Sequence, residues 1–348
     1  MENMDNRRQK ILSCYSFSVG NIEKLDNRSD VFKITDDKKA DYFIKIFDKS
    51  GGYDMMPGEN IYYTYEQIQL EAEILNILSK SILKTAAPVR NKTGGFVTSF
   101  NSGDDNNKSS EYAVITSFID GSTIADAKQQ TLTTDMAYLT GVSAAQFHLE
   151  SEKQLLSLAV KRPHKRQDYL KKILSRLSYG KEKKIFNAPQ FEMLSQCCGV
   201  VLDCMNRLDK DPSYNIGLVH TDIRPVNCIY APDKVTFIDF SRSVYSYYLF
   251  DVGEMCLHGD FGGSPDVQNA VLRGYHSVKP FKKDHLFMMQ VFFAMFIMWV
   301  MAECIDSDRD YKTWLENVLK WFADEVHPGL ISGKGYMNPS VFKDIDEV

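Results

Sequence analysis

The sequence predicts an α+β chain in two lobes: a β-sheet N-terminal lobe with one long helix, and a mainly helical C-terminal lobe. Three observations predict it. Short runs of β-branched and aromatic residues fill residues 1–115, an amphipathic helical pattern interrupts them once, and helical patterns dominate residues 122–348. We expect residues 116–121 to be the hinge that joins the lobes.

In the N-terminal lobe, residues 29–37 and 41–49 are expected to form strands on either side of the charged turn 36–40. Glycine and proline in residues 51–60 indicate a loop. Apolar residues at helical spacing then predict a helix over 65–83. Three further strands are expected at 86–91, 94–100 and 111–119.

The C-terminal lobe is predicted to be mostly helical, with one hairpin formed by residues 227–231 and 234–240. Residues 286–302 are apolar enough to imitate a short membrane span, but they contain Gln290 and charged residues stand close on both sides. We expect a buried core helix there. The other helices are expected at 135–150, 166–177 and 191–208.

The bulk composition indicates a folded globular protein, because 44% of the 348 residues are hydrophobic and 25% are charged. A net charge of −5 argues against nucleic acid as a partner. The seven cysteines are scattered, and the first residues lack the apolar stretch of a signal peptide. We therefore expect a cytoplasmic protein with reduced thiols that binds no membrane. The sequence leaves the oligomeric state open.

The stretch "HTDIRPVN", residues 220–227, followed by "IDF", residues 238–240, carries the chemistry of phosphoryl transfer. Such a reaction needs a group that orients the acceptor hydroxyl and receives its proton, and it needs hard oxygen ligands for Mg²⁺. Asp222 is the candidate base, and Asn227 and Asp239 are the candidate metal ligands. A turn and two strands with incidental polar residues are the alternative. An Asp between Ile238 and Phe240 suits that alternative poorly.

The N-terminal lobe should then supply a cation for the α- and β-phosphates of ATP or GTP. Lys45, in the middle of the strand 41–49, is the candidate, and Glu71 on the following helix is expected to steady it. Glu73 is the rival partner. The two glutamates lie two positions apart, so they point in different directions on a helix.

These motifs resemble those of the aminoglycoside phosphotransferase and choline kinase-like family, which has the bilobal protein-kinase-like fold. The resemblance rests on "VHTDIRPVN", "FIDFSRS" and "FDVGEM", and it spans residues 20–325. It implies that backbone groups of Thr116, Ser117 and Phe118 contact the nucleotide base. It also implies that Asp251 supports the catalytic loop and that His148 is structural.

Two positions depart from the family's pattern, and a third is open to two interpretations. Thr221 stands where the family usually has glycine, and the loop "LDNRSDVF", residues 25–32, which should cover the phosphates, contains no glycine. Ser29 in that loop is the candidate phosphate contact there, with an ordinary polar turn as the alternative. Arg224 either stabilises charge on the transferred phosphoryl group or forms a surface salt bridge.

The sequence therefore predicts a kinase that moves the γ-phosphate of ATP or GTP, with Mg²⁺, to a hydroxyl of a small molecule. A cationic acceptor is possible if acidic residues line the acceptor site. The alternatives are a homoserine-, hydroxylysine- or choline-type metabolic kinase, a Ser/Thr protein kinase, and a nucleotide-binding pseudokinase. The acidic candidates are Glu254, Asp260, Glu303, Asp306 and Asp308.

Overall fold

The computed structural model describes most of the chain. The described residues are 4–25, 31–47, 52–56, 59–62, 64–102, 109–123, 132–259, 263–307 and 310–348. The chain divides into two compact units. The N-terminal unit comprises Met1–Tyr53, Asn60–Gly121 and Ile238–Ser241, and the C-terminal unit comprises Asp54–Glu59, Ser122–Phe237 and Arg242–Val348.

A five-stranded antiparallel sheet with the order β1-β2-β3-β7-β6 forms the N-terminal unit. Its inward-facing residues alternate with more exposed ones, most clearly in β2, as a half-buried strand requires. The strands are β1 (Val19–Lys24), β2 (Val31–Asp36), β3 (Asp41–Phe47), β6 (Val97–Ser102) and β7 (Ser109–Ser117).

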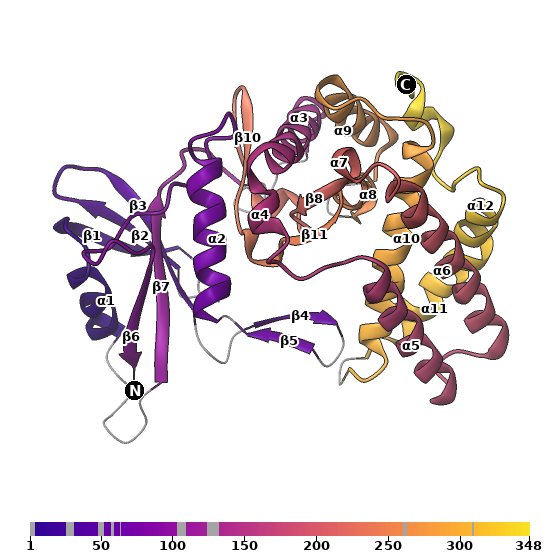
Figure 1. The fold of residues 1–348 in the computed structure, drawn as a ribbon, viewed down its shortest axis with the longest axis horizontal. Helices are drawn as coiled ribbons and strands as arrows, with labels where there is room; N and C mark the ends of the chain where they lie inside the picture. Colours follow the sequence, from indigo (N-terminus) through magenta and orange to yellow (C-terminus); the bar gives the residue numbers. More distant parts are fainter. Residues whose placement is uncertain are drawn as a thin grey trace. The chain divides into compact units, whose positions relative to one another are not determined.

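Two helices cover the sheet, as Figure 1 shows. Helix α2 (Tyr65–Leu78) begins at the cap residue Thr64 and packs Ile68 against the sheet with Phe47, Val97 and Val114. Helix α1 (Met4–Ser13) contributes Ile11 to a second cluster, which holds Phe32, Ile34, Ile44 and Ile115. The expected helix over 65–83 is present but ends at Leu78.

Two local predictions are wrong. Residues 51–60 were expected to be a loop, but β4 (Gly52–Met56) and β5 (Glu59–Tyr62) form a two-stranded sheet. Gly52 is the first residue of β4, so a glycine that indicated a loop lies at the end of a strand. Residues 86–91 were expected to be a strand, but they form only the isolated bridge between Pro88 and Thr116. Helix α1 and strand β1 were not predicted at all.

The C-terminal unit is mostly helical, as predicted. Helix α3 (Thr134–Glu150) packs extensively against α9 (Pro265–Val278). The other α-helices are α4 (Leu156–Ala159), α5 (Gln167–Glu182), α6 (Ala188–Leu208), α7 (Pro212–Asn215), α8 (Tyr248–Leu257), α10 (His285–Cys304), α11 (Lys312–Trp321) and α12 (His327–Ile331). Short π-helical segments follow α3 and α11, at Ser151–Leu155 and Phe322–Val326.

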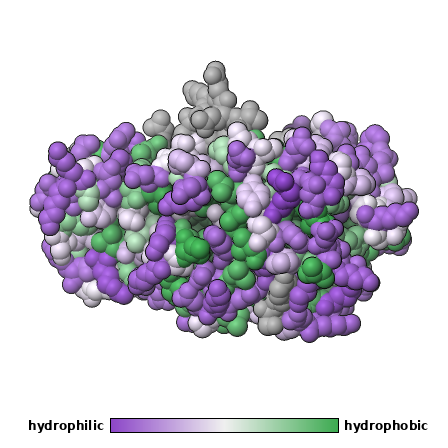
Figure 2. Space-filling model, turned by 90° about the horizontal axis from the view of Figure 1, so that it is seen from above, coloured by the Kyte–Doolittle hydropathy of each residue, from purple (hydrophilic) through white to green (hydrophobic). Residues whose placement is uncertain are grey.

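Helix α10 corresponds to the apolar stretch 286–302. Its length and composition would allow it to cross a membrane, but 72% of its most apolar window is buried inside the structure. It packs against α8, α6 and α5. On the face drawn in Figure 2, hydrophobic residues form small areas among hydrophilic ones. The helix is therefore a core helix of the C-terminal unit, as the sequence predicts.

Two small antiparallel pairs flank the predicted catalytic loop. Strand β8 (Ile216–Val219) pairs with β11 (Val244–Tyr247) and runs directly into His220. Strands β9 (Cys228–Ala231) and β10 (Lys234–Phe237) form the expected hairpin directly after Asn227. Residues 220–227 are thereby held at both ends by paired strands.

Candidate active site

The loop that carries Asp222 is fixed at its start by Asp251 of α8. The backbone N–H groups of His220 and Thr221 donate to the two carboxylate oxygens of Asp251, each over 2.8 Å. Asp251 is fully buried. A buried carboxylate that accepts backbone hydrogen bonds sets the backbone path of the loop. This is the supporting contact that the family resemblance implied for Asp251.

Thr221 has a backbone φ of 57°, in the left-handed region that favours glycine. Its hydroxyl donates to the carbonyl of Arg242 over 2.8 Å. The loop thus keeps the conformation that a glycine would adopt, at a cost in backbone strain that this hydrogen bond offsets in part.

His148 of α3 supports Asp251 from the other side. Its ring is completely buried, with Nε2 3.0 Å from Oδ2 of Asp251 and Nδ1 2.8 Å from the hydroxyl of Tyr275. Burial lowers the pKa of His148 more than the neighbouring carboxylate of Asp251 raises it. A neutral ring donates from Nε2 to Asp251 and accepts from Tyr275 at Nδ1. His148 therefore orients Asp251, which fits its expected structural role.

Asp222 lies within this loop, and its carboxylate is held on both oxygens. The Asn227 side-chain amide nitrogen donates to Oδ2 over 2.8 Å and to the Asp222 carbonyl over 2.9 Å. The Arg224 Nε atom lies 3.0 Å from Oδ1. The Asp222 side chain is 15% exposed. Because the nitrogen of Asn227 is engaged, its amide oxygen is directed elsewhere and is chemically suited to a hard cation.

Asp239 and Lys45 lie together in the N-terminal unit. The Lys45 ammonium is 2.9 Å from Oδ1 of Asp239, and the Ser241 hydroxyl donates to the same oxygen over 2.7 Å. Lys45 stands in the middle of β3, opposite Val31 on one side and Val114 on the other. Asp239 has a φ of 61°. A functional candidate held in a rare backbone conformation is typical of active sites.

The remaining sequence candidates are placed as follows. Glu71 is buried on α2, and Glu73 accepts a hydrogen bond from Gln69. The backbone N–H groups of Ser117 and Phe118 already donate within the unit, to the carbonyls of Ala87 and Asp41. Those bonds give no support to base contacts through these N–H groups. Thr116 is buried in β7, and Ser29 lies outside the described residues.

Sequence reasoning missed one group of residues in the C-terminal unit. Lys165, just before α5, is 5% exposed, and its ammonium lies over the rings of Tyr169, Phe250 and Trp299. Glu254 and Glu303 interact with it electrostatically. The Lys165 cluster comprises Lys165, Tyr169, Phe250, Glu254, Trp299 and Glu303. Of these six residues, only Glu254 and Glu303 were named in the sequence analysis, as acidic candidates for the acceptor site.

The other acidic candidates do not join this cluster. Asp306 forms an ion pair with Arg176 over 2.7 Å, with its own side chain 55% exposed. Asp260 and Asp308 lie outside the described residues. In the described part of the chain, no three His, Cys, Asp or Glu side chains gather into a metal-binding group.

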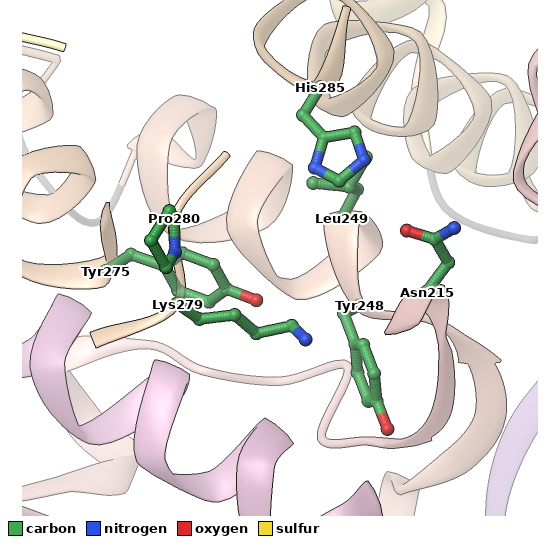
Figure 3. Close-up of a pocket in the computed structure, with 7 residues that line it drawn as sticks. All are labelled: Asn215, Tyr248, Leu249, Tyr275, Lys279, Pro280 and His285. Atoms are coloured by element: carbon green, nitrogen blue, oxygen red, sulfur yellow. The ribbon is translucent and has the colours of Figure 1, made fainter. Parts of the chain in front are cut away.

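Figure 3 shows a small cavity that is lined by Asn215, Tyr248, Leu249, Tyr275, Lys279, Pro280 and His285. The Lys279 ammonium is paired with Glu152 over 2.6 Å. The Tyr248 hydroxyl donates to the Ser151 hydroxyl oxygen, which also accepts from the N–H of Leu218. These contacts support strand β8, and none of the lining residues belongs to the predicted site.

Comparison with known proteins assigns the fold and the family. The model of the phosphotransferase enzyme family matches residues 23–286. No curated protein sequence matches the chain. The chain is similar to a microcompartment-associated aminopropanol kinase, with 16% identity, a TM-score of 0.66, and coverage of 96% of this chain and 99% of that one.

Two further solved structures are similar. An amicoumacin kinase bound to AMP-PNP and Ca²⁺ has 15% identity and a TM-score of 0.66, covering 96% of this chain and 95% of that one. A spectinomycin phosphotransferase bound to ADP has 13% identity and a TM-score of 0.56, covering 95% and 97%. The predicted α+β, protein-kinase-like fold is confirmed.

The chain belongs to the phosphotransferase enzyme family. It is accordingly a kinase that uses a nucleotide to phosphorylate a hydroxyl group of a small molecule, as the sequence predicts.

Proposed function

We propose that the protein transfers the γ-phosphoryl group of ATP or GTP, as the magnesium complex, to a hydroxyl group of a small acceptor that carries an amine. The observation that carries this proposal is the set of contacts and the backbone conformation that hold the loop at Asp222. Asp251 holds its backbone, Thr221 adopts the conformation of glycine, and Asn227 holds the carboxylate. Such a strained and buried arrangement is typical of a catalytic loop.

In the proposed reaction, Asp222 orients the acceptor hydroxyl and receives its proton. The hydroxyl oxygen forms a bond to the γ-phosphorus, the bond from that phosphorus to the β,γ-bridging oxygen breaks, and the nucleoside diphosphate leaves. Arg224, now paired with Asp222, would move its charge to the transferred phosphoryl group. Lys45 would hold the α- and β-phosphates.

Magnesium would be held by Asn227 and Asp239 together with phosphate oxygens. The donor set supports this choice, because one amide oxygen and one carboxylate are hard ligands and too few to bind a metal ion without the nucleotide. The ion would neutralise the phosphate charge. Lys45 occupies Oδ1 of Asp239 in this structure, and we expect it to turn to the phosphates when the nucleotide binds.

The proposal is tested by magnesium-dependent release of nucleoside diphosphate, with ATP and GTP, against amino alcohols, aminoglycosides and hydroxy amino acids. Asp222→Asn should lower kcat by about 10² or more, the usual contribution of a general base. Asp239→Asn should abolish magnesium-dependent nucleotide binding in calorimetry. Chelation of magnesium should stop turnover, and Mn²⁺ should restore it.

Asp203→Asn is the matched control, since Asp203 is exposed on α6. Its activity should equal that of the wild type. Acceptor-stimulated turnover that survives Asp222→Asn would show that Asp222 is not the base. Nucleotide binding that neither Asp239→Asn nor chelation affects would remove the metal role.

A further inference from the structure

The Lys165 cluster contains a cation that is buried at high energetic cost. The Lys165 ammonium lies 4.9 Å from the ring centroid of Trp299, 5.2 Å from that of Phe250 and 5.4 Å from that of Tyr169. Among the described residues no ion pair of Lys165 is recorded. Aromatic faces stabilise a cation only in part, and a buried charge without a close counter-ion is costly. A protein keeps such a group where a ligand uses it.

The same cluster contains polar atoms that are buried without hydrogen-bond partners among the described residues. They include two donors, the Tyr169 hydroxyl and Nε1 of Trp299, and one acceptor, Oε2 of Glu254. Most buried polar groups in proteins are hydrogen-bonded, so three of them around one lysine are exceptional. A ligand that carries both an anionic group and an ammonium group would supply partners for the donors and for the acceptor.

The cluster also lies close to the candidate base. Burial raises the pKa of Glu254, and the negative charges of Asp251 and Asp222 raise it further. Burial lowers the pKa of Lys165 to about 8, which the charge of Glu254 opposes. Asp222, Glu254 and Lys165 therefore share one electrostatic environment within the C-terminal unit.

We propose that Lys165 is a specificity-determining residue of the acceptor site, and that the acceptor is a hydroxy amino acid. The acceptor carboxylate would accept from Lys165, Tyr169 and Trp299, and its ammonium group would donate to Glu254. The acceptor hydroxyl would then lie at Asp222. This inference rests on the proposed function and narrows its acceptor to molecules that carry a carboxylate as well as an amine.

The test compares acceptors that differ only by the carboxylate. The pairs are L-homoserine with 3-aminopropan-1-ol, L-threonine with 1-aminopropan-2-ol, and L-serine with ethanolamine. Nucleoside diphosphate release by the full-length enzyme gives kcat/KM for each. In the pair whose chain length fits the acceptor site, we expect kcat/KM of the wild type to be at least tenfold higher for the amino acid than for its amino alcohol. Lys165→Met should lower kcat/KM for that amino acid at least tenfold and reverse the preference.

Two further variants delete the two unpartnered donor groups: Tyr169→Phe removes a single oxygen atom, and Trp299→Phe removes the N–H together with part of the indole ring. Each variant should lower kcat/KM for the amino acid more than kcat/KM for its amino alcohol. Tyr169→Phe should have a melting temperature equal to or higher than that of the wild type. Lys171→Met is the matched control, because Lys171 lies on α5, the helix that Lys165 precedes, with its side chain 74% exposed. Its preference should equal that of the wild type.

The outcomes separate this inference from the proposed function. Turnover of amino alcohols or aminoglycosides, with no amino acid preferred, would overturn the inference and leave the kinase assignment intact. A preference that Lys165→Met does not alter would also overturn it. If no acceptor is turned over, calorimetry on the wild type decides. Amino acid binding that Lys165→Met abolishes supports the inference, and the lack of any binding overturns it.

Discussion

The conformation of one residue, Thr221, links the sequence of the catalytic loop to its geometry. Thr221 stands at a position where the family's pattern has glycine, and it adopts a φ of 57°. A β-branched residue is strained there by about 1–2 kcal/mol. Its hydroxyl bond to the carbonyl of Arg242 explains why the substitution is tolerated.

We predict that the free energy of unfolding of Thr221→Gly is higher than that of Thr221→Ala by about 1 kcal/mol. Both variants lose the hydroxyl, so their difference isolates the backbone. Glycine relieves the left-handed strain, and its larger entropy in the unfolded chain cancels only part of that gain. Urea unfolding curves measure the difference. Equal stability of the two variants would mean that the loop relaxes when the hydroxyl is removed.

The sequence predicted the residue types of the site better than their contacts. The motif at 220–227 and the Asp at 239 could be proposed as site residues because their spacing is local. The pairing of Asp222 with Arg224, and the contact of Lys45 with Asp239, depend on side-chain directions that no sequence pattern encodes. Lys165 was missed because it stands in the basic run 161–172, which resembles a solvated helix face, and only the burial around it distinguishes it.

At the scale of helices, the contact between α3 and α9 positions the residues that orient Asp251, which in turn holds the predicted catalytic loop. Helix α3 carries His148 and α9 carries Tyr275, which are hydrogen-bonded to each other. The helices approach closely because each has a glycine at the contact. A Cβ atom on Gly141 would lie 2.0 Å from the carbonyl oxygen of Val271, and one on Gly274 would lie 2.0 Å from that of Tyr138.

We predict that Gly274→Ala destabilises the protein by on the order of 3 kcal/mol, because backbone atoms must move to admit the methyl group. The displaced α9 should also loosen Tyr275 from His148, so kcat should fall in the folded fraction. Gly199→Ala is the control, since a Cβ at that position of α6 meets nothing within 4 Å. It should stabilise by up to about 1 kcal/mol. Thermal unfolding of both variants measures these effects, and a neutral Gly274→Ala would contradict the close packing.

Helices could be predicted more accurately than strands. Helix α10 was predicted from its apolar run within two residues at each end, and α3 within one residue. Long segments with a clear pattern determine their own structure. The β4–β5 hairpin and the bridge at Pro88 were assigned incorrectly, because short strands form only when a partner is available.

At the scale of the whole molecule, the α+β class followed from the order of the patterns, but the sheet order β1-β2-β3-β7-β6 did not. Strand pairs far apart in sequence, such as β3 with β7, are selected by burial of both faces of the sheet. A single sequence gives no signal for such pairs. The stability of each unit likewise depends on titratable groups that only the fold buries. One of them lines the cavity shown in Figure 3.

His285 lines that cavity and is 5% exposed. Burial, together with the charges of Lys282 and Lys279, lowers its pKa to about 4. Between pH about 4 and its ordinary value of 6.5, the unfolded chain therefore binds more protons at this residue than the folded one. Stability should fall as the pH falls through this window, by up to about 3 kcal/mol. His148 acts in the same direction, whereas the raised pKa of Glu254 opposes it.

We predict that His285→Gln removes this single contribution. Glutamine can still accept from the N–H of Lys282, as Nδ1 of His285 does, but it does not titrate. The free energy of unfolding of the variant should be lower than that of the wild type at pH 7, and the gap should shrink or reverse by pH 5. His148 and Glu254 titrate in both proteins, so their effects cancel in the difference. His327→Gln, near the surface, is the control for replacing an imidazole by an amide. A gap for His285→Gln that stays constant from pH 7 to pH 5 would mean that the cavity admits enough water to solvate the charged ring.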